Sequence, residues 1–281
     1  MENVVLNNGV LSVTISTYGA EVVSAIRNGK EMVWQGSEKF WTGHSPLLFP
    51  VCGAFRDFKY EYKGNTYEIP PHGFTRKSNF EITSKSENSV TMTLIQSAEN
   101  KAVYPFEYDF VVTYSIKENQ LTSVVEVKNN QSEPMYFSFG SHESFNLEGA
   151  LEEYSVELEN EEVFLSPKIV GRLLTYENID FGSGKVIKLE KQLFKYDTFM
   201  LRDISSRKLF LRHGDKIIAQ FDYDASNLLI WQPVGAPFIC IEPWFRAPDY
   251  IDTCHDITKK PKMIKVDGQK SFTSTRTVTY F

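Results

Sequence analysis

Positive charge and long apolar runs are both scarce in this sequence of 281 residues. Lysine and arginine number 30 against 36 aspartates and glutamates, so the net charge is −6 and the basic stripe that binds a phosphate backbone is missing. No run approaches the roughly 18 apolar residues of a membrane span, and the start of the chain lacks the pattern of a secretory signal. These absences predict a cytoplasmic protein without nucleic-acid or membrane partners.

Signatures of cofactors and of common nucleophiles are also missing. The three cysteines, Cys52, Cys240 and Cys254, form no C-x-x-C spacing, which predicts free thiols in a reducing compartment. No two of the five histidines lie within four residues of each other, so no local metal-ligand pair exists. Because a phosphate-binding glycine loop, a dinucleotide fingerprint and a G-x-S-x-G elbow are absent, we expect neither a metal nor a nucleotide cofactor.

The hydrophobic pattern has a period of two. Apolar and polar residues alternate in LSVTIS (11–16), VTMTL (90–94) and DFVVTYSI (109–116), as they do in half-buried strands. Turn-forming Asn8-Gly9, Asn28-Gly29 and Lys63-Gly64-Asn65 separate such runs. Only residues 97–102 and 37–41 suggest short helices, and no linker or repeat divides the chain. The pattern predicts an all-β protein, a large antiparallel sandwich or barrel, with one domain over residues 1–281.

Five local clusters stand apart from the strand pattern. They are SPLLFPVCG (45–53), PPHGFTR (70–76), FGSHESFN (139–146), WQP (231–233) and PFICIEPW (237–244). Gly73 allows a close approach of the chain beside His72. Glu242 ends an apolar run, where a carboxylate is costly to bury unless it has a partner or a proton-transfer task.

Each of these residues also has a purely structural interpretation. A histidine among aromatic side chains is often a hydrogen-bonded core residue, and we assign this role to His44, His213 and His255. For His72 and His142 the two interpretations are evenly balanced. Glu242 alone would be a strand-end cap or an ion-pair partner. Trp231 and Trp244 alone would be core residues, and Asp197 a turn residue.

Taken in chain order, the clusters resemble the aldose 1-epimerase (galactose mutarotase-like) family. The order LLFPVCG, PPHGFTR, FGSHESFN, KYDTFML (195–201) and WQP…PFICIEPW is similar to that of its LacX-like branch. The resemblance implies a twisted antiparallel β-sandwich of the galactose mutarotase-like type, with an open sugar-binding face and no cofactor. It also implies interconversion of the α and β anomers of a hexose or related sugar by acid–base ring opening and closing.

The same resemblance implies roles for individual residues. His142 would be the general acid and Glu242 the general base, placed on opposite sides of the C1–O5 region of the sugar. His72 would donate a hydrogen bond near the ring oxygen. The implied substrate-binding set is completed by Asp197, Arg56, Trp231 and Trp244, although Ala54 stands where the family's arginine is expected and Arg56 is only the nearest arginine.

Two departures from the family pattern change the expected charge of the site. Glu143 follows His142 where many relatives have proline, and a carboxylate within reach would raise the pKa of the imidazole unless it points into solvent. Arg246 stands where a glycine is expected, which would bring a cation close to the site and favour an anionic sugar.

Two other functions stay open at this point. One is a non-catalytic sugar-binding or sugar-sensing protein on the same fold, since fold alone does not determine function. The other is glycoside cleavage by Glu242 with Asp197, although a histidine as the best-matched acid argues against it. Arg56, Arg76 and Arg246 could bind a phosphate, but scattered arginines more often pair with surface carboxylates. The identity of the sugar, its phosphorylation and the choice between monomer and homodimer also stay open.

Overall fold

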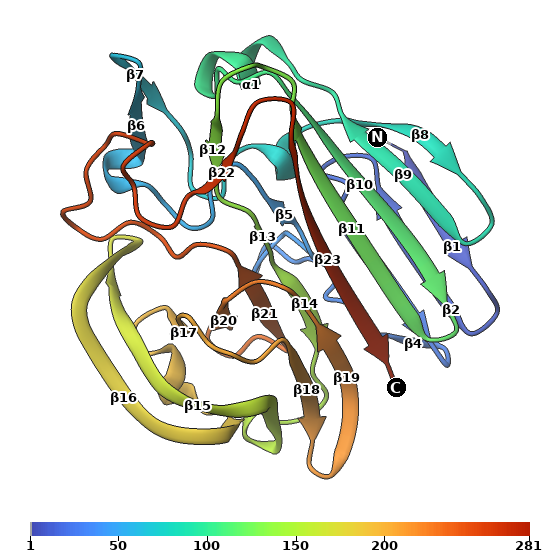
Figure 1. Ribbon diagram of the computed structural model, residues 1–281. Helices are drawn as coiled ribbons and strands as arrows, with labels where there is room; N and C mark the ends of the chain where they lie inside the picture. The colour runs from blue at the N-terminus through green and yellow to red at the C-terminus, as the bar shows by residue number, and fades with distance from the viewer. Residues whose placement is uncertain (1) are drawn as a thin grey trace.

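The computed structural model describes residues 2–281 and is built almost entirely of β-strands (Figure 1). The largest sheet has nine strands, in the order β16 (Leu173–Lys188), β15 (Tyr154–Val170), β18 (Lys208–His213), β19 (Lys216–Asp222), β23 (Ser271–Tyr280), β11 (Gln120–Asn129), β10 (Tyr108–Lys117), β9 (Ser89–Leu94) and β8 (Phe80–Lys85). A six-stranded sheet has the order β17 (Thr198–Leu201), β20 (Asn227–Trp231), β21 (Phe238–Trp244), β13 (Gly140–Ser141) and β5 (Leu47–Leu48), and β14 (Glu143–Asn146) also pairs with β21.

Three smaller sheets and a few helical turns complete the structure. The sheets are β1 (Asn3–Asn7), β2 (Leu11–Ser16), β3 (Val22–Arg27) and β4 (Lys30–Glu31); β6 (Lys59–Tyr62) with β7 (Asn65–Glu68); and β12 (Met135–Phe137) with β22 (Ile264–Val266). The helices are α1 (Ala98–Val103) and the 3₁₀ turns η1 (Arg56–Phe58), η2 (Thr75–Lys77), η3 (Leu151–Glu153) and η4 (Lys191–Phe194). The all-β antiparallel sandwich predicted from the sequence is confirmed.

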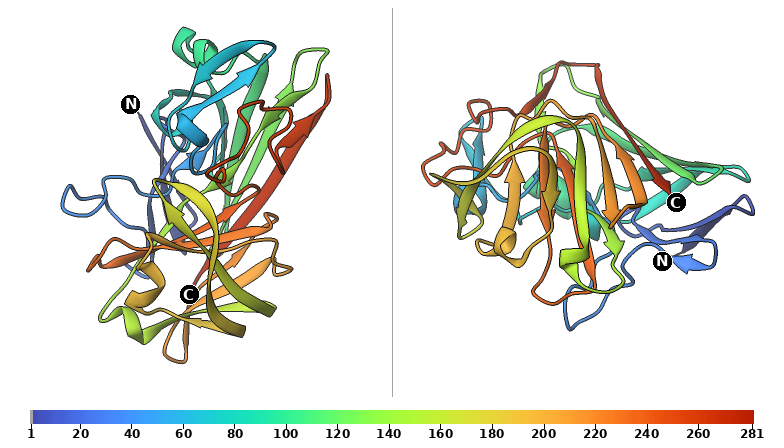
Figure 2. Two further views of the ribbon diagram at one scale, coloured as in Figure 1. Left: turned by 90° about the vertical axis from the view of Figure 1, so that its left-hand side faces the viewer. Right: turned by 90° about the horizontal axis from the view of Figure 1, so that it is seen from below.

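Alternation of side chains builds the core. In β10 every second residue from Tyr108 to Ile116 is buried, because successive side chains of a strand point to opposite faces. One cluster of buried apolar residues extends from Val4 to Tyr280 and joins the sheets into a single core. Figure 2 shows the strongly twisted sheets wrapped around this core from two further directions.

The six-stranded sheet is covered on both faces near β21, all seven residues of which are buried. One face contributes Phe199, Ile230 and Ile241 to the main core. Because neighbouring residues point the other way, Thr198, Trp231 and Glu242 face the opposite side of the same strands. This second face forms the floor of the site described below.

The turns and one of the two short helices expected from the sequence are confirmed, and the other helix is wrong. Left-handed backbone occurs at Gly9, Asn28-Gly29 and Lys63-Gly64, as the turn dipeptides predicted. The helix expected near residues 97–102 is α1, with Ser97 capping its N-terminus through a hydrogen bond from the Asn100 N–H. The helix expected at 37–41 is wrong, because Ser37 and Trp41 instead pair across a tight turn that is too short for a helical nucleus.

The three cysteines form no disulfide bond with one another, as the sequence predicted. Cys52, Cys240 and Cys254 are free, and the first two are buried. Among the helices of residues 2–281, none has the length and apolar character needed to cross a bilayer.

Candidate active site

His142 and Glu242 meet because of strand register. His142 lies between β13 and β14, which both run beside β21 (Figure 1). Gly140 of β13 pairs with Trp244, and Glu143 of β14 pairs with Ile241. These two pairings put His142 directly opposite Glu242 on β21. Directly opposed residues of antiparallel strands project from the same face of the sheet, at contact distance. Two side chains distant in sequence are therefore neighbours for a purely geometric reason.

The imidazole and the carboxylate are in direct contact. Nε2 of His142 lies 3.2 Å from Oε1 of Glu242, and the two residues are only 9% and 2% exposed. Burial raises the pKa of Glu242 well above its usual 4.5, and the charges of Glu143 and Asp197 raise it further. Burial lowers the pKa of His142 well below 6.5, with a further contribution from Arg76. Both groups thus favour their neutral forms, and the pair holds one proton between two atoms.

Aromatic side chains fix the orientation of the His142 ring. Trp41 stacks on it with a centroid distance of 4.7 Å and an interplanar angle of 28°. Trp231 meets the same ring edge-on at 5.6 Å. Such packing leaves the imidazole little rotational freedom, so Nε2 stays directed at Glu242.

His72 is held by backbone contacts in a strained conformation. Its φ of 65° lies in the left-handed region, and its N–H donates to the Gly53 carbonyl at 2.8 Å. The Gly53 N–H donates to Nδ1 of His72 at 3.3 Å, so the ring proton of the neutral imidazole is on Nε2. Burial, Arg76 and Arg172 lower the pKa of His72 to about 3, which keeps this ring a neutral hydrogen-bond donor.

Gly73 is required for the close approach that positions His72. We expect Gly73→Ala to destabilise the protein strongly, because a Cβ there would lie 2.2 Å from the Phe49 carbonyl oxygen and the φ of +67° disfavours alanine. The left-handed backbone alone costs on the order of 1–3 kcal/mol, and the clash adds to it. Gly64→Ala is the matched control in denaturant unfolding, since φ is +79° there but no atom lies within 4 Å of the added Cβ. Equal losses in the two variants would contradict the role of the close approach.

These side chains line one open cavity of about 540 Å³. Its lining residues are Trp41, His72, Arg76, His142, Arg172, Asp197, Thr198, Leu229, Trp231, Glu242 and Trp244. Of the seven residues proposed from the sequence, the structure brings six together here. Arg56 is the exception, because its guanidinium faces Asp57 at 3.7 Å and it does not line the cavity.

Five further residues line the cavity. Arg76, in the motif PPHGFTR, is considered from the sequence only as a candidate phosphate ligand, and the sequence does not indicate the other four. Trp41, Arg172, Thr198 and Leu229 carry no local signal, because they reach the cavity only through the turn after β4, the β15–β16 turn and the pairing of β17 and β20 with β21.

Glu143 and Arg246 do not enter the cavity, contrary to the sequence-based expectation. Glu143 lies against Arg276, with Oε1 3.1 Å from Nε, and accepts a hydrogen bond from the Ser141 hydroxyl, so it neither faces solvent nor reaches the His142 ring. Arg246 is buried and donates to Asp249 and to the Pro261 carbonyl. Each side chain is held outside the cavity by a buried partner of opposite charge, Arg276 for Glu143 and Asp249 for Arg246.

The remaining histidines are outside the site, but they are half-buried rather than the core residues that the sequence predicted. His213 faces Glu153 at 3.0 Å, His255 faces Asp57 at 3.2 Å, and His44 lies near Glu21. Within residues 2–281, no group of three or more histidine, cysteine, aspartate or glutamate side chains is arranged to hold a metal ion.

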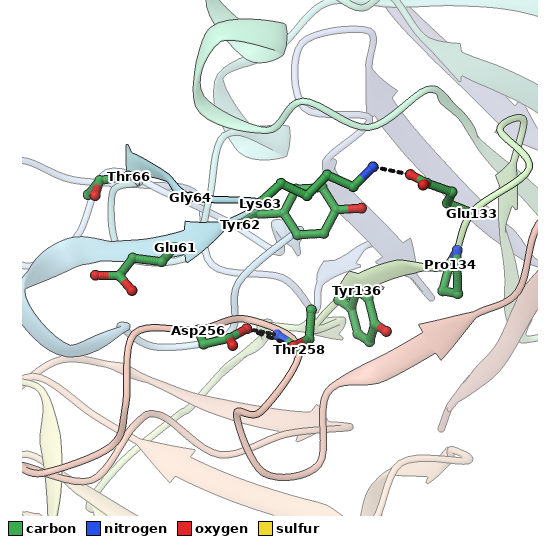
Figure 3. A pocket seen from close by; sticks show the side chains of 10 residues that line it. All are labelled: Glu61, Tyr62, Lys63, Gly64, Thr66, Glu133, Pro134, Tyr136, Asp256 and Thr258. Carbon is green, nitrogen blue, oxygen red and sulfur yellow. Dashed lines mark hydrogen bonds and ion pairs between the residues drawn. The ribbon is translucent and has the colours of Figure 1, made fainter.

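A second cavity, of about 560 Å³, lies between the β6–β7 hairpin and the loop around Asp256 (Figure 3). Lys63 and Glu133 form an ion pair at its edge, and Asp256 accepts a hydrogen bond from Thr258. Its lining contains no histidine, and its ion pair joins two exposed side chains. The buried contact between an imidazole and a carboxylate belongs to the first cavity.

The family model described as aldose 1-epimerase matches residues 2–260 of the chain. The chain belongs to the aldose 1-epimerase family. This aldose 1-epimerase family member is 31% identical over 280 residues to the plasmid-encoded protein LacX of Lactococcus lactis, a match that covers 93% of each chain. The LacX-like branch predicted from the motifs is thereby confirmed.

Solved structures agree with this family assignment. A galactose mutarotase related enzyme from Lactobacillus acidophilus superposes with a TM-score of 0.92 at 29% identity, covering all of this chain and 97% of the other. A galactose mutarotase-like protein from Lactobacillus casei also gives 0.92, at 27% identity and full coverage of both chains.

Proposed function

We propose that this member of the aldose 1-epimerase family interconverts the α and β anomers of an aldose. The observation that carries the proposal is the contact between the His142 imidazole and the Glu242 carboxylate at the floor of an open cavity. Tryptophan side chains at the same cavity supply the flat apolar surfaces on which sugar rings stack. The similarity to two structures described as galactose mutarotase relatives supports the same chemistry.

The contact between His142 and Glu242 suits the opening of a sugar ring. Ring opening needs a proton delivered to the ring oxygen O5 and another removed from the anomeric hydroxyl O1. Both oxygens are bonded to C1, so an acid and a base that already touch can each reach one of them. The groups therefore act from one side of the sugar, rather than from opposite sides of the C1–O5 region as expected from the sequence.

One proton on the pair is enough for the full cycle. The protonated partner donates to O5 while the C1–O5 bond breaks, and the other partner takes the O1 proton as the C1=O1 bond forms. Rotation about C1–C2 presents the other face of the aldehyde, and the two transfers reverse to close the ring. His72, as a neutral donor at Nε2, is suited to hold the sugar oxygen in place during rotation. Each positioned proton transfer contributes about 10²–10⁴-fold.

The pH dependence of kcat/KM follows from this shared proton. We expect a bell-shaped profile with a broad plateau, because only the singly protonated pair is active. The midpoint of the acid limb is expected below pH 6.5, the usual pKa of histidine, because burial lowers the pKa of His142. The midpoint of the alkaline limb is expected well above pH 4.5, because burial raises the pKa of Glu242. Rates corrected for spontaneous exchange between pH 3 and 10 would test this, and a rate that rises steadily with pH would contradict it.

The activity itself is tested by anomer exchange followed by NMR or polarimetry with purified protein. Enzyme-dependent exchange with at least one free or phosphorylated hexose is the expected result. Sugar binding without any acceleration of exchange would instead favour the non-catalytic sugar-binding function. Release of a reducing sugar from a glycoside would favour cleavage by Glu242 and Asp197, which the contact of Glu242 with an imidazole argues against.

A further inference from the structure

Two arginines line the cavity without a carboxylate partner. Arg76 lies in η2, and Arg172 occupies the turn between β15 and β16 with a φ of 71°. Across residues 2–281, neither guanidinium forms an ion pair or a hydrogen bond, and Nε of Arg76 is buried with no acceptor. Arginines in a protein with a net charge of −6 have many carboxylates available, so two unpaired ones at one cavity indicate a missing anion.

The cations act together on one part of the cavity. Both arginines line the same cavity as His72. Beyond the effect of burial, both guanidinium charges lower the pKa of His72, and Arg172 lowers the pKa of Arg76. Two carboxylates lie in the surroundings. The charge of Glu21 raises the pKa of Arg76, but its carboxylate already accepts hydrogen bonds from the N–H groups of His44 and Ser45. Asp197 acts on Glu242 instead, at the acid–base end.

We propose that the substrate is an aldose that carries a phosphomonoester, bound by Arg76 and Arg172. This inference rests on the proposed anomer exchange. Two guanidinium groups balance a phosphomonoester, which carries about −1.5 to −2 charges near pH 7, better than they balance a carboxylate or a neutral hydroxyl. The ester cannot be at C1, because ring opening requires a free anomeric hydroxyl. In a pyranose O5 closes the ring and C6 is bonded to C5 beside it, so a phosphate at C6 lies on the ring-oxygen side of the sugar, the side that His72 is expected to bind.

Anomer exchange of matched sugars tests this substrate class. We expect kcat/KM for a hexose 6-phosphate to exceed that for the same free hexose at least tenfold at low ionic strength, mainly through KM. The advantage falls as salt is added, because exposed Arg172 is screened. Arg76→Gln and Arg172→Gln each reduce the phosphate-to-free ratio about tenfold, the scale of one charge-assisted hydrogen bond.

Arg56→Gln is the matched control, since it removes the same charge from a residue that does not line the cavity. It leaves the phosphate-to-free ratio unchanged. If Arg56→Gln lowers the phosphate-to-free ratio as much as Arg172→Gln does, the effect comes from the overall charge of the protein, and the assignment of the anion site is overturned. A hexuronate preferred over the hexose 6-phosphate would also overturn it, because a carboxylate would then be the anion bound.

A binding experiment separates this inference from the proposed activity. 1,5-Anhydroglucitol 6-phosphate has no anomeric hydroxyl and cannot change anomer, so its calorimetric affinity reports the anion site alone. We expect it to bind at least tenfold more tightly than 1,5-anhydroglucitol, and to lose that advantage in Arg172→Gln. Exchange of free hexoses without any preference for the phosphate in rate or affinity would overturn the inference and leave the proposed function standing. Tight binding of the phosphate without exchange of any sugar would overturn the proposed function and leave the anion site standing.

Discussion

Glu242→Gln is expected to lower kcat for anomer exchange by about 10²–10⁴-fold, because the amide neither accepts nor releases the shared proton. The substitution keeps the shape of the side chain and its place opposite His142 on β21. KM changes less than kcat, since the proton transfers belong to the transition state and not to ground-state binding. NMR exchange rates at saturating sugar provide the measurement.

His142→Asn is expected to give a loss of similar size, and the double variant little more than either single one. Groups that act as one unit are strongly non-additive, because removing either partner already ends the shared proton transfer. Additive losses in the double variant would show that the two residues act independently. An unchanged rate in Glu242→Gln across free and phosphorylated sugars would end the proposed mechanism.

Stability provides the folding control for Glu242→Gln. The pKa of Glu242 is raised in the folded protein, so the stability it contributes is present at acid pH and is lost as pH rises through the folded pKa. Glutamine does not ionise and escapes this loss. We therefore expect the variant to unfold at the same temperature as the wild type or above it, with an advantage that increases with pH.

Asp249→Asn is expected to lower the free energy of unfolding by about 3–5 kcal/mol, because it leaves two buried cations without their counter-charge. Asp249 is fully buried, and its Oδ1 lies 2.5 Å from Nη2 of Arg246. Oδ2 accepts from the Lys260 ammonium and from the Arg56 N–H. The same cluster ties the loop after β21 to the segment before η1, where Pro248 packs against Gly53 beside His72.

Asp203→Asn is the matched control for this effect. Asp203 pairs with Lys262, and both side chains are more than half exposed, so breaking that pair costs about 0–1 kcal/mol. Urea unfolding of the two variants gives the comparison directly. Similar small losses in both would contradict the view that the Asp249 cluster holds the site loops together.

Local patterns account for much of what could be predicted about this protein. Alternation at 11–16, 90–94 and 109–116 specified strands, because the side-chain period of a strand depends on the backbone alone. Asn28-Gly29 and Lys63-Gly64 specified turns through their tolerance of positive φ. Glu242 in an apolar run and His72 beside Gly73 are recognisable from the sequence alone as a costly buried charge and a closely packed histidine. The motifs around them were sufficient to indicate the family.

Tertiary structure alone decided which charged groups face the cavity. Arg56 and Arg246 lie near motif residues in the chain, but their guanidinium groups face Asp57 and Asp249 and do not line the cavity. Arg172 enters the cavity from a turn that carries no motif. The contact of His142 with Glu242 likewise depends on the pairing of β13 and β14 with β21, which only long-range strand register determines. Residue types and local backbone are properties of short segments, but the partner of a charge depends on which distant segments the fold brings together.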